Sequence, residues 1–348
     1  MGEEGEAAEP KPAEEEPREL NVAEQAAEEA RRESWASCIP TVFSLAPEEV
    51  TTLQPPPRYH MNLPRQSFLP LVTAPVVEHF LPFAPPTAHA SSMWIQYDGE
   101  ALRWQVPIGV LYDVLMEVND DTAPTDSLPW QLVVRFQGGP VGQQQPYGLL
   151  RATVDDAKAL VRCALKESTH LRCGTARPVM DLSPAEDSRI FQALSAPFPP
   201  HAFDGSRRKF QSALAGSVTS PTAQSRQPST SSSPYDLFSH TRATLEKAIS
   251  DVLGGEPERA IPIRVFVTQR EWRQLPVSPT LPSGDWTTLA DALELLLPQA
   301  IGAARDGDAL ILVQGVVMAL NMPLPWLYSA CAHPDGFLYV SCHMPKGL

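Results

Sequence analysis

The chain has 348 residues and a formal net charge of −14, which arises from 27 Lys and Arg against 41 Asp and Glu. This length corresponds to about two domains. Residues 1–34 contain twelve glutamates against four basic residues, so most of the acidity lies in an N-terminal tail. The acidic balance argues against nucleic-acid binding, which requires clustered Lys and Arg, and against charge-driven adsorption to anionic lipid.

Hydrophobic residues make up 43% of the chain and charged residues 20%, which is enough apolar material for a sizeable core. The most hydrophobic stretch, residues 309–320, is shorter than the ~20 residues that cross a bilayer. The acidic start does not resemble a secretory signal. Five cysteines without a Cys-x-x-Cys pair favour reduced thiols over a disulfide framework, and therefore a cytosolic location.

The first half of the chain predicts a small mixed unit after a disordered tail and a short helix. Residues 93–97 indicate a strand, 98–100 a tight turn and 101–106 the hairpin partner. The other predicted elements are strands at 39–45, 59–63 and 130–136, and helices at 68–80 and 107–112.

The second half repeats this order. Pro107 with Leu111-Tyr112 matches Pro323 with Leu327-Tyr328 at an offset of 216 residues. The elements predicted here are strands at 261–269, 272–281, 309–314, 315–320 and 337–342, and helices at 287–301 and 323–328. Such self-similarity indicates a duplicated domain. Two hairpins around one helix form an α+β unit of the ubiquitin-like, or β-grasp, kind.

Between the repeats, residues 153–173 have a helical period with one apolar stripe that includes Ala157, Val161 and Leu165. Lys166 lies nine residues after Ala157, which places it about 180° from the centre of this stripe at 100° per residue. We therefore expect its ammonium group to face solvent or a partner.

The predicted organisation is α+β, with two ubiquitin-like domains flanking a helix-rich segment. Its parts are a disordered acidic tail (1–22), an N-terminal helix (23–36), the first ubiquitin-like domain (37–140), the helix-rich segment (152–210), a low-complexity linker (211–235), a helix (236–256) and the second ubiquitin-like domain (260–345).

Other residue groups give little support for catalysis or metal binding. Cys163 and His170 lie seven residues apart on one helix, about 10.5 Å in rise, which is too far for a nucleophile and its base. Cys173 adds no complete zinc set, and no Gly-rich phosphate loop follows a strand. For Trp94, Trp104 and Trp130, core packing is the first interpretation, and a groove for a partner helix is the alternative.

Several motifs together resemble the autophagy protein 5 family over about residues 34–345. They are Trp35 with Ile39-Pro40-Thr41 and Phe43, Leu63-Pro64-Arg65, Trp94, Tyr97, Gly99, Trp104, Pro107-Ile108-Gly109 and Asp113, Leu128-Pro129-Trp130, Cys163-Ala164-Leu165-Lys166-Glu167, Ile261-Pro262-Ile263-Arg264, Pro323-Leu324-Pro325-Trp326-Leu327, and Pro334-Asp335-Gly336-Phe337-Leu338.

The resemblance implies a non-catalytic protein without cofactor or metal, joined by an isopeptide bond to autophagy protein 12. Lys166 matches the family's acceptor lysine. The resemblance also implies a transient conjugating enzyme, autophagy protein 10, and non-covalent binding to autophagy protein 16 in a groove near Trp35. The assembly would promote transfer of autophagy protein 8 to phosphatidylethanolamine, in the cytoplasm and at the periphery of the phagophore assembly site membrane, with no nucleic-acid partner.

Conjugation requires little more of the acceptor protein than an accessible lysine on a rigid element. A lysine of ordinary pKa, ~10.4, is almost entirely protonated near pH 7, so the conjugating enzyme must activate the amine. Only six lysines occur: Lys11, Lys158, Lys166, Lys209, Lys247 and Lys346. Two alternatives remain. One is a non-covalent ubiquitin-like adaptor whose Lys166 is never modified. The other is a hydrolase or transferase, for which the sequence shows no nucleophile–base arrangement.

Overall fold

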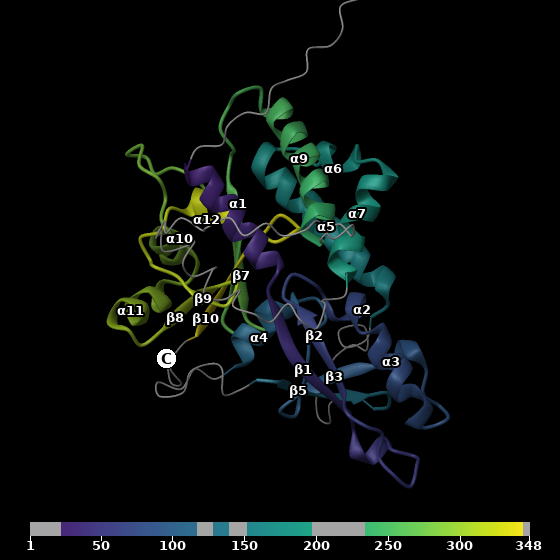
Figure 1. Ribbon diagram of the computed structural model, residues 1–348. Helices are drawn as coiled ribbons and strands as arrows, with labels where there is room; N and C mark the ends of the chain where they lie inside the picture. Colours follow the sequence, from purple (N-terminus) through teal and green to yellow (C-terminus); the bar gives the residue numbers. More distant parts are fainter. Residues whose placement is uncertain (1–21, 117–127, 139–151, 197–233, 344–348) are drawn as a thin grey trace, which may run out of the picture.

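A computed structural model describes residues 22–116, 128–138, 152–196 and 234–343. Two five-stranded sheets lie side by side, with a group of helices packed beside them (Figure 1). The predicted disordered tail, most of the predicted linker and the end of the helix-rich segment fall outside the described residues. No helix in the described part of the chain is long and apolar enough to span a bilayer.

The first sheet has the strand order β2-β1-β5-β3-β4. The strands are β1 (Cys38–Leu45), β2 (Tyr59–Pro64), β3 (Trp94–Tyr97), β4 (Glu100–Ala101) and β5 (Trp130–Arg135). The central pair β1 and β5 is parallel, with Phe43 opposite Leu132, and the other pairs are antiparallel. The helices of this domain are α2 (Leu69–Val72), α3 (Ala74–Phe80) and α4 (Ile108–Leu115).

The second sheet repeats this order as β7-β6-β10-β8-β9. The strands are β6 (Ile261–Phe266), β7 (Trp272–Val277), β8 (Leu310–Val313), β9 (Val316–Val317) and β10 (Leu338–His343), and the helices are α10 (Leu289–Leu296), α11 (Pro298–Asp306) and α12 (Leu324–Cys331). The parallel pair is again central, between β10 and β6. Two sheets with the same β-grasp topology confirm the predicted duplication and the α+β fold class.

The two copies bury equivalent residues. Leu111 and Leu327 are fully buried, and each is followed by a nearly buried tyrosine, Tyr112 or Tyr328. The leucine of each short helix therefore closes the core of its own domain, which is why the motif recurs at a fixed offset.

Some predicted element lengths are wrong. The strand predicted at 101–106 ends at Ala101, because the chain turns between Arg103 and Val106, where the Val106 amide donates to the Arg103 carbonyl. Likewise, β9 is shorter than residues 315–320. The helix predicted at 287–301 is interrupted at Leu297, since Pro298 restricts the residue before it and starts a new helix.

The helical region consists of α5 (Val154–Cys173), α6 (Arg177–Met180), α7 (Pro184–Ser195) and α9 (Pro234–Leu253), where α9 begins two residues before the predicted start. The N-terminal helix α1 (Val22–Trp35) connects both cores. Ala27 and Ala30 are buried in the core of the second domain, and Trp35 joins the first core, where it stacks on Phe238 with ring centroids 5.0 Å apart.

Candidate functional site

The helix α5 is firmly terminated at both ends. At its start, the Thr153 hydroxyl accepts from the Asp156 amide (3.2 Å), and the Asp156 carboxylate accepts from the Thr153 amide (2.8 Å). These hydrogen bonds hold the pKa of Asp156 below its usual value. At its end, Gly174 adopts a left-handed conformation with φ +82° and its amide donates to the His170 carbonyl. Such caps fix the helix as a rigid platform.

One face of α5 is buried and the other carries Lys166. Ala157, Val161 and Leu165 lie in the core, whereas Lys166 is exposed and makes no hydrogen bond or ion pair within the described part of the chain. The predicted solvent-facing position of Lys166 is confirmed. An exposed lysine on a capped helix can present its amine to a large partner without local unfolding.

The residues that follow Lys166 attach this turn of α5 to the second ubiquitin-like domain. One carboxylate oxygen of Glu167 accepts from Gln274 Nε2 (2.7 Å) and the other from Arg264 Nη2 (3.2 Å). The Ser168 hydroxyl donates to the Asp335 carbonyl at 2.8 Å. Both contacts restrain the backbone that carries Lys166, and they leave the Lys166 side chain free.

A buried polar cluster behind this turn joins the two domains. His333 Nε2 lies 2.9 Å from the Gln66 carbonyl of the first domain, and since a carbonyl only accepts, Nε2 carries the proton. His333 Nδ1 lies 2.9 Å from Asp335 Oδ1, and the Tyr339 hydroxyl donates to Asp335 Oδ2 at 2.7 Å. Burial opposes ionisation of Asp335, but His333, Arg264 and Tyr339 outweigh it and hold the pKa of this carboxyl below its usual value.

The lowered pKa of Asp335 predicts acid sensitivity of the domain junction. A carboxyl whose pKa is lower in the folded state stabilises the fold fully above its unfolded value, ~3.9, and this contribution disappears as pH falls through the folded value. We expect Asp335→Asn to flatten the loss of urea stability between about pH 5 and pH 3. Urea midpoints across this range test the expectation. A variant as acid-sensitive as the parent chain would contradict it.

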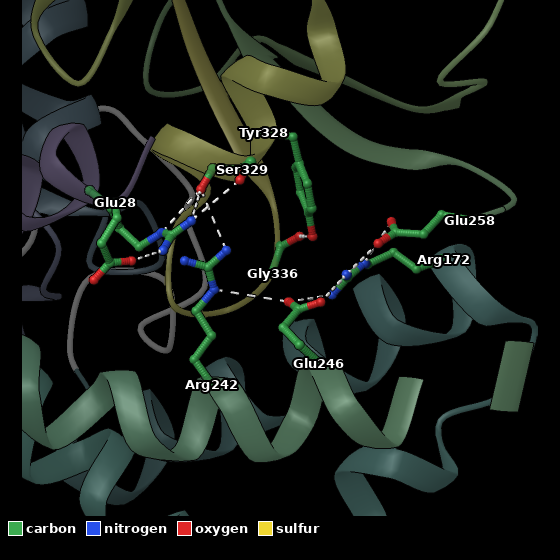
Figure 2. A network of polar contacts seen from close by, with 9 residues as sticks. Glu28, Arg172, Arg242, Glu246, Glu258, Tyr328, Ser329 and Gly336 are labelled. Atoms are coloured by element: carbon green, nitrogen blue, oxygen red, sulfur yellow. Dashed lines mark hydrogen bonds and ion pairs between the residues drawn. The ribbon is translucent and has the colours of Figure 1, made fainter. Parts of the chain in front are cut away.

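A second buried network fixes the other end of α5 (Figure 2). The buried Arg172 guanidinium donates to Glu246 on α9 (3.0 and 2.5 Å) and to Glu258 before β6 (2.9 and 2.6 Å). It lies 5.4 Å from the ring of Tyr328 on α12, whose hydroxyl donates to the Gly336 carbonyl. Burial opposes the charge of Arg172, but Tyr328 and the two carboxylates raise its pKa well above the usual value.

The same network includes α1. Arg31 pairs with Glu28 and donates through Nε to the Ser329 carbonyl of α12 at 3.0 Å. Arg242 on α9 also donates to that carbonyl, at 3.4 Å. Contacts from α1, α5, α9 and α12, which are far apart in sequence, thus meet around Ser329 and Arg172 (Figure 2).

The remaining lysines occupy different environments. Lys158 is half-buried, lies 4.0 Å from Asp155 and packs over the Phe191 ring. Lys247 is exposed on α9. Lys11, Lys209 and Lys346 fall outside the described residues. Lys247 is therefore a matched exposed helical lysine with which to compare Lys166.

The cysteines and histidines do not form a reactive group in the described residues. All five cysteines are free. Cys163 and His170 are exposed, and Cys173 is buried with its thiol directed to the Thr169 carbonyl. Burial raises the pKa of Cys331 to about 12 and that of Cys342 to about 11, so neither is a ready thiolate. No group of three or more possible metal ligands occurs in the described ranges.

The two buried networks are not predicted from the sequence, where neither His333 nor Arg172 stands out as a candidate functional residue. The available signal was the charge of Arg172 on the predicted apolar side of α5, since a buried arginine is rare unless it is paired.

Comparisons with known proteins match both repeats to one family. Residues 34–136 match the model described as "Autophagy protein ATG5, UblA domain", and residues 260–342 match "Autophagy protein ATG5, UblB domain". Together these two domains account for more than half of the chain.

Similar proteins carry the same family name. Autophagy protein 5 of Oryza sativa subsp. indica is 32% identical over 166 residues, which cover 48% of this chain and 40% of the rice protein. The match to the rice protein therefore spans less than half of its length. Autophagy protein 5 of Aspergillus fumigatus is 25% identical over 358 residues, covering 90% of this chain and 94% of that protein.

A solved structure gives the same fold. The crystal structure of Kluyveromyces marxianus Atg5 superposes with a TM-score of 0.61 at 20% sequence identity, covering 90% of this chain and 99% of that one. Both domain models match the chain, relatives align with it along almost its full length, and the fold is shared. The chain therefore belongs to the autophagy protein 5 family.

Proposed function

We propose that this chain is a non-catalytic autophagy scaffold to which the ubiquitin-like modifier autophagy protein 12 is covalently attached through Lys166. The single observation that carries the proposal is the exposed, unpaired position of Lys166 on a capped helix, with Glu167 and Ser168 next to it bound to the second ubiquitin-like domain. Family membership supplies the context, since Lys166 lies in the motif that matches the family's acceptor.

The proposed chemistry is acyl transfer from a thioester on the conjugating enzyme autophagy protein 10. The neutral Lys166 amine attacks the thioester carbonyl, the C–N bond of the isopeptide forms and the C–S bond breaks. The enzyme's thiol leaves and the excess proton passes to solvent. In this proposal the chain contributes the position of the amine, since no described residue forms a hydrogen bond or ion pair with Lys166.

We further propose that the conjugate binds autophagy protein 16 without a covalent bond and promotes transfer of autophagy protein 8 to phosphatidylethanolamine. The expected location is the cytoplasm, with peripheral association at the phagophore assembly site membrane through the complex. Trp35 itself is buried against Phe238, so a partner helix near α1 would contact the exposed face of α1 rather than Trp35.

Reconstitution tests the proposal. The full chain is incubated with the modifier, its activating enzyme, its conjugating enzyme and ATP, and the products are separated on a denaturing gel. The proposal expects one adduct that resists thiol reductants, since an isopeptide bond is not reduced. If non-covalent binding is measured but no adduct forms, the chain is a ubiquitin-like adaptor and the proposed attachment is wrong.

A further inference from the structure

A pocket of about 340 Å³ opens between the first ubiquitin-like domain and the start of α5. It is lined by Leu69 of α2 and Val77 of α3, by Trp94 of β3 and by Trp104, which follows β4. Residues 152–154 also line it. Among the described residues, none from α1 or from the second domain lines it, so the pocket is separate from the groove near Trp35. It also lies far from Lys166, which is twelve residues along α5 from Val154, or about 18 Å.

The pocket walls are apolar and already shaped. Trp94 is held in place because its Nε1 donates to the Gln137 carbonyl at 3.1 Å and the Arg135 guanidinium lies 5.5 Å from its ring. Trp104, which also lines the pocket, is half-buried. A volume of this size is at the lower end of the range for ligand pockets and accommodates a bulky side chain, as the anchor pockets of protein interfaces do.

The polar groups of the pocket are mostly occupied. The Thr73 hydroxyl donates to the Leu69 carbonyl at 2.8 Å, and the Thr153 hydroxyl belongs to the cap with Asp156. A small polar metabolite, which is usually fixed by several converging polar groups, would find few of them free. An apolar side chain of a larger partner needs none.

The pocket carries an acidic residue. Glu78 on α3 is the only charged residue among the described residues that line the pocket, and its exposed carboxylate forms no hydrogen bond or ion pair with them. Asp155 lies directly after Val154 with an almost fully exposed side chain, and Lys158 lies 4.0 Å from it. The basic Arg103 precedes Trp104 but is not among the residues that line the pocket. An occupant with a positive charge beside its apolar group is therefore favoured.

We propose that this pocket binds a basic amphipathic segment of a partner protein, which inserts one bulky apolar side chain between the walls and places a Lys or Arg against Glu78. The aromatic side chains of the pocket shield the partner's apolar side chain from water, and the Glu78 carboxylate favours a positively charged residue beside it. This binding is independent of attachment at Lys166, and its test does not require the modifier.

The probe is a capped helical peptide of about 15 residues with a central Trp-Leu pair flanked by lysines, since shorter helices are marginal in water. A matched peptide carries Glu in place of each Lys. Binding to the full chain is measured by fluorescence anisotropy and located by hydrogen exchange. We expect the lysine peptide to bind more tightly than the Glu peptide and to protect residues 69–78 and 93–104.

Two variants with matched controls test the site. Glu78→Lys should weaken the lysine peptide by about 5- to 10-fold, the effect of losing and reversing one exposed charge contact. Ala74→Trp, which places a large side chain at the pocket wall, should abolish binding. Asp251→Lys and Ala159→Trp, which alter exposed helical positions outside the pocket, should leave binding unchanged.

Three results would overturn the proposal. They are equal binding of the two peptides, loss of binding in the control variants as large as in the pocket variants, and binding only after residues 140–150 are replaced by a Gly-Ser linker. The last result would make the chain's own segment the occupant of the pocket.

Discussion

Lys166→Arg is expected to abolish the covalent adduct with the modifier, with a decrease of more than about 100-fold in the initial rate of adduct formation. The reason is that the arginine guanidinium (pKa above ~12) stays protonated and is not a nucleophile at neutral pH. Arginine keeps the positive charge and the helix propensity of the position, so docking of the conjugating enzyme and folding should be preserved. Gel quantification of adduct against time measures the rate.

The structure provides a matched control for this substitution. Lys247→Arg changes an exposed lysine on another helix and should leave the rate unchanged, as should Lys158→Arg, whose parent side chain packs over Phe191. If Lys166→Arg forms adduct at the parental rate and Lys247→Arg does not, Lys247 is the acceptor. If all three variants react normally, the acceptor lies among the lysines outside the described residues.

Arg172→Met is expected to lower the free energy of unfolding by about 1.5 to 3 kcal/mol, the loss of charge-assisted hydrogen bonds from a buried guanidinium to two partly exposed carboxylates. Methionine fills much of the space of the arginine stem, so the main loss is electrostatic. Glu258 loses the Arg172 cation, Glu246 keeps only the 3.9 Å contact with Arg242, and Tyr328 loses its guanidinium contact. Because α5, α9 and α12 meet here, the loss should loosen their packing as well (Figure 2). Urea unfolding followed by circular dichroism measures the change.

The control for Arg172 is an exposed ion pair on the neighbouring helix. Arg177 lies 3.5 Å from Asp181 with both side chains largely exposed, so Arg177→Met should cost less than about 1 kcal/mol. A triple variant that adds Glu246→Gln and Glu258→Gln to Arg172→Met should recover part of the lost stability, because it removes the two carboxylates. Equal effects of Arg172→Met and Arg177→Met would contradict the stabilising role of the buried network.

Local patterns in the sequence predicted the duplicated fold well. Three patterns identified both domains and the orientation of Lys166: the repeated Pro and Leu-Tyr motif, the alternating strands and the apolar stripe of α5. Each of them depends on residues that are only a few positions apart. The errors occurred where tertiary structure or proline competes with a local pattern. The chain turns after Ala101 to begin α4, and Pro298 divides the helix that the period alone would continue.

The polar networks could not be predicted because their partners are far apart in sequence. Arg172 meets Glu246 and Glu258 only after the helices pack, and His333 reaches Gln66 only when the two domains lie side by side. Neither spacing nor composition specifies these pairs. For the same reason, the sequence raised a groove beside Trp94 and Trp104 only as an alternative, and the structure was needed to show that the two residues share a pocket lined by Glu78.

The most direct measurement is mass spectrometry of the adduct formed by the unmodified full chain. After digestion, we expect a branched peptide in which the modifier's C-terminal residue is joined to the Lys166 side chain, with no branch at Lys158 or Lys247. A branch at a different lysine, with Lys166 recovered in an unbranched peptide, would contradict it.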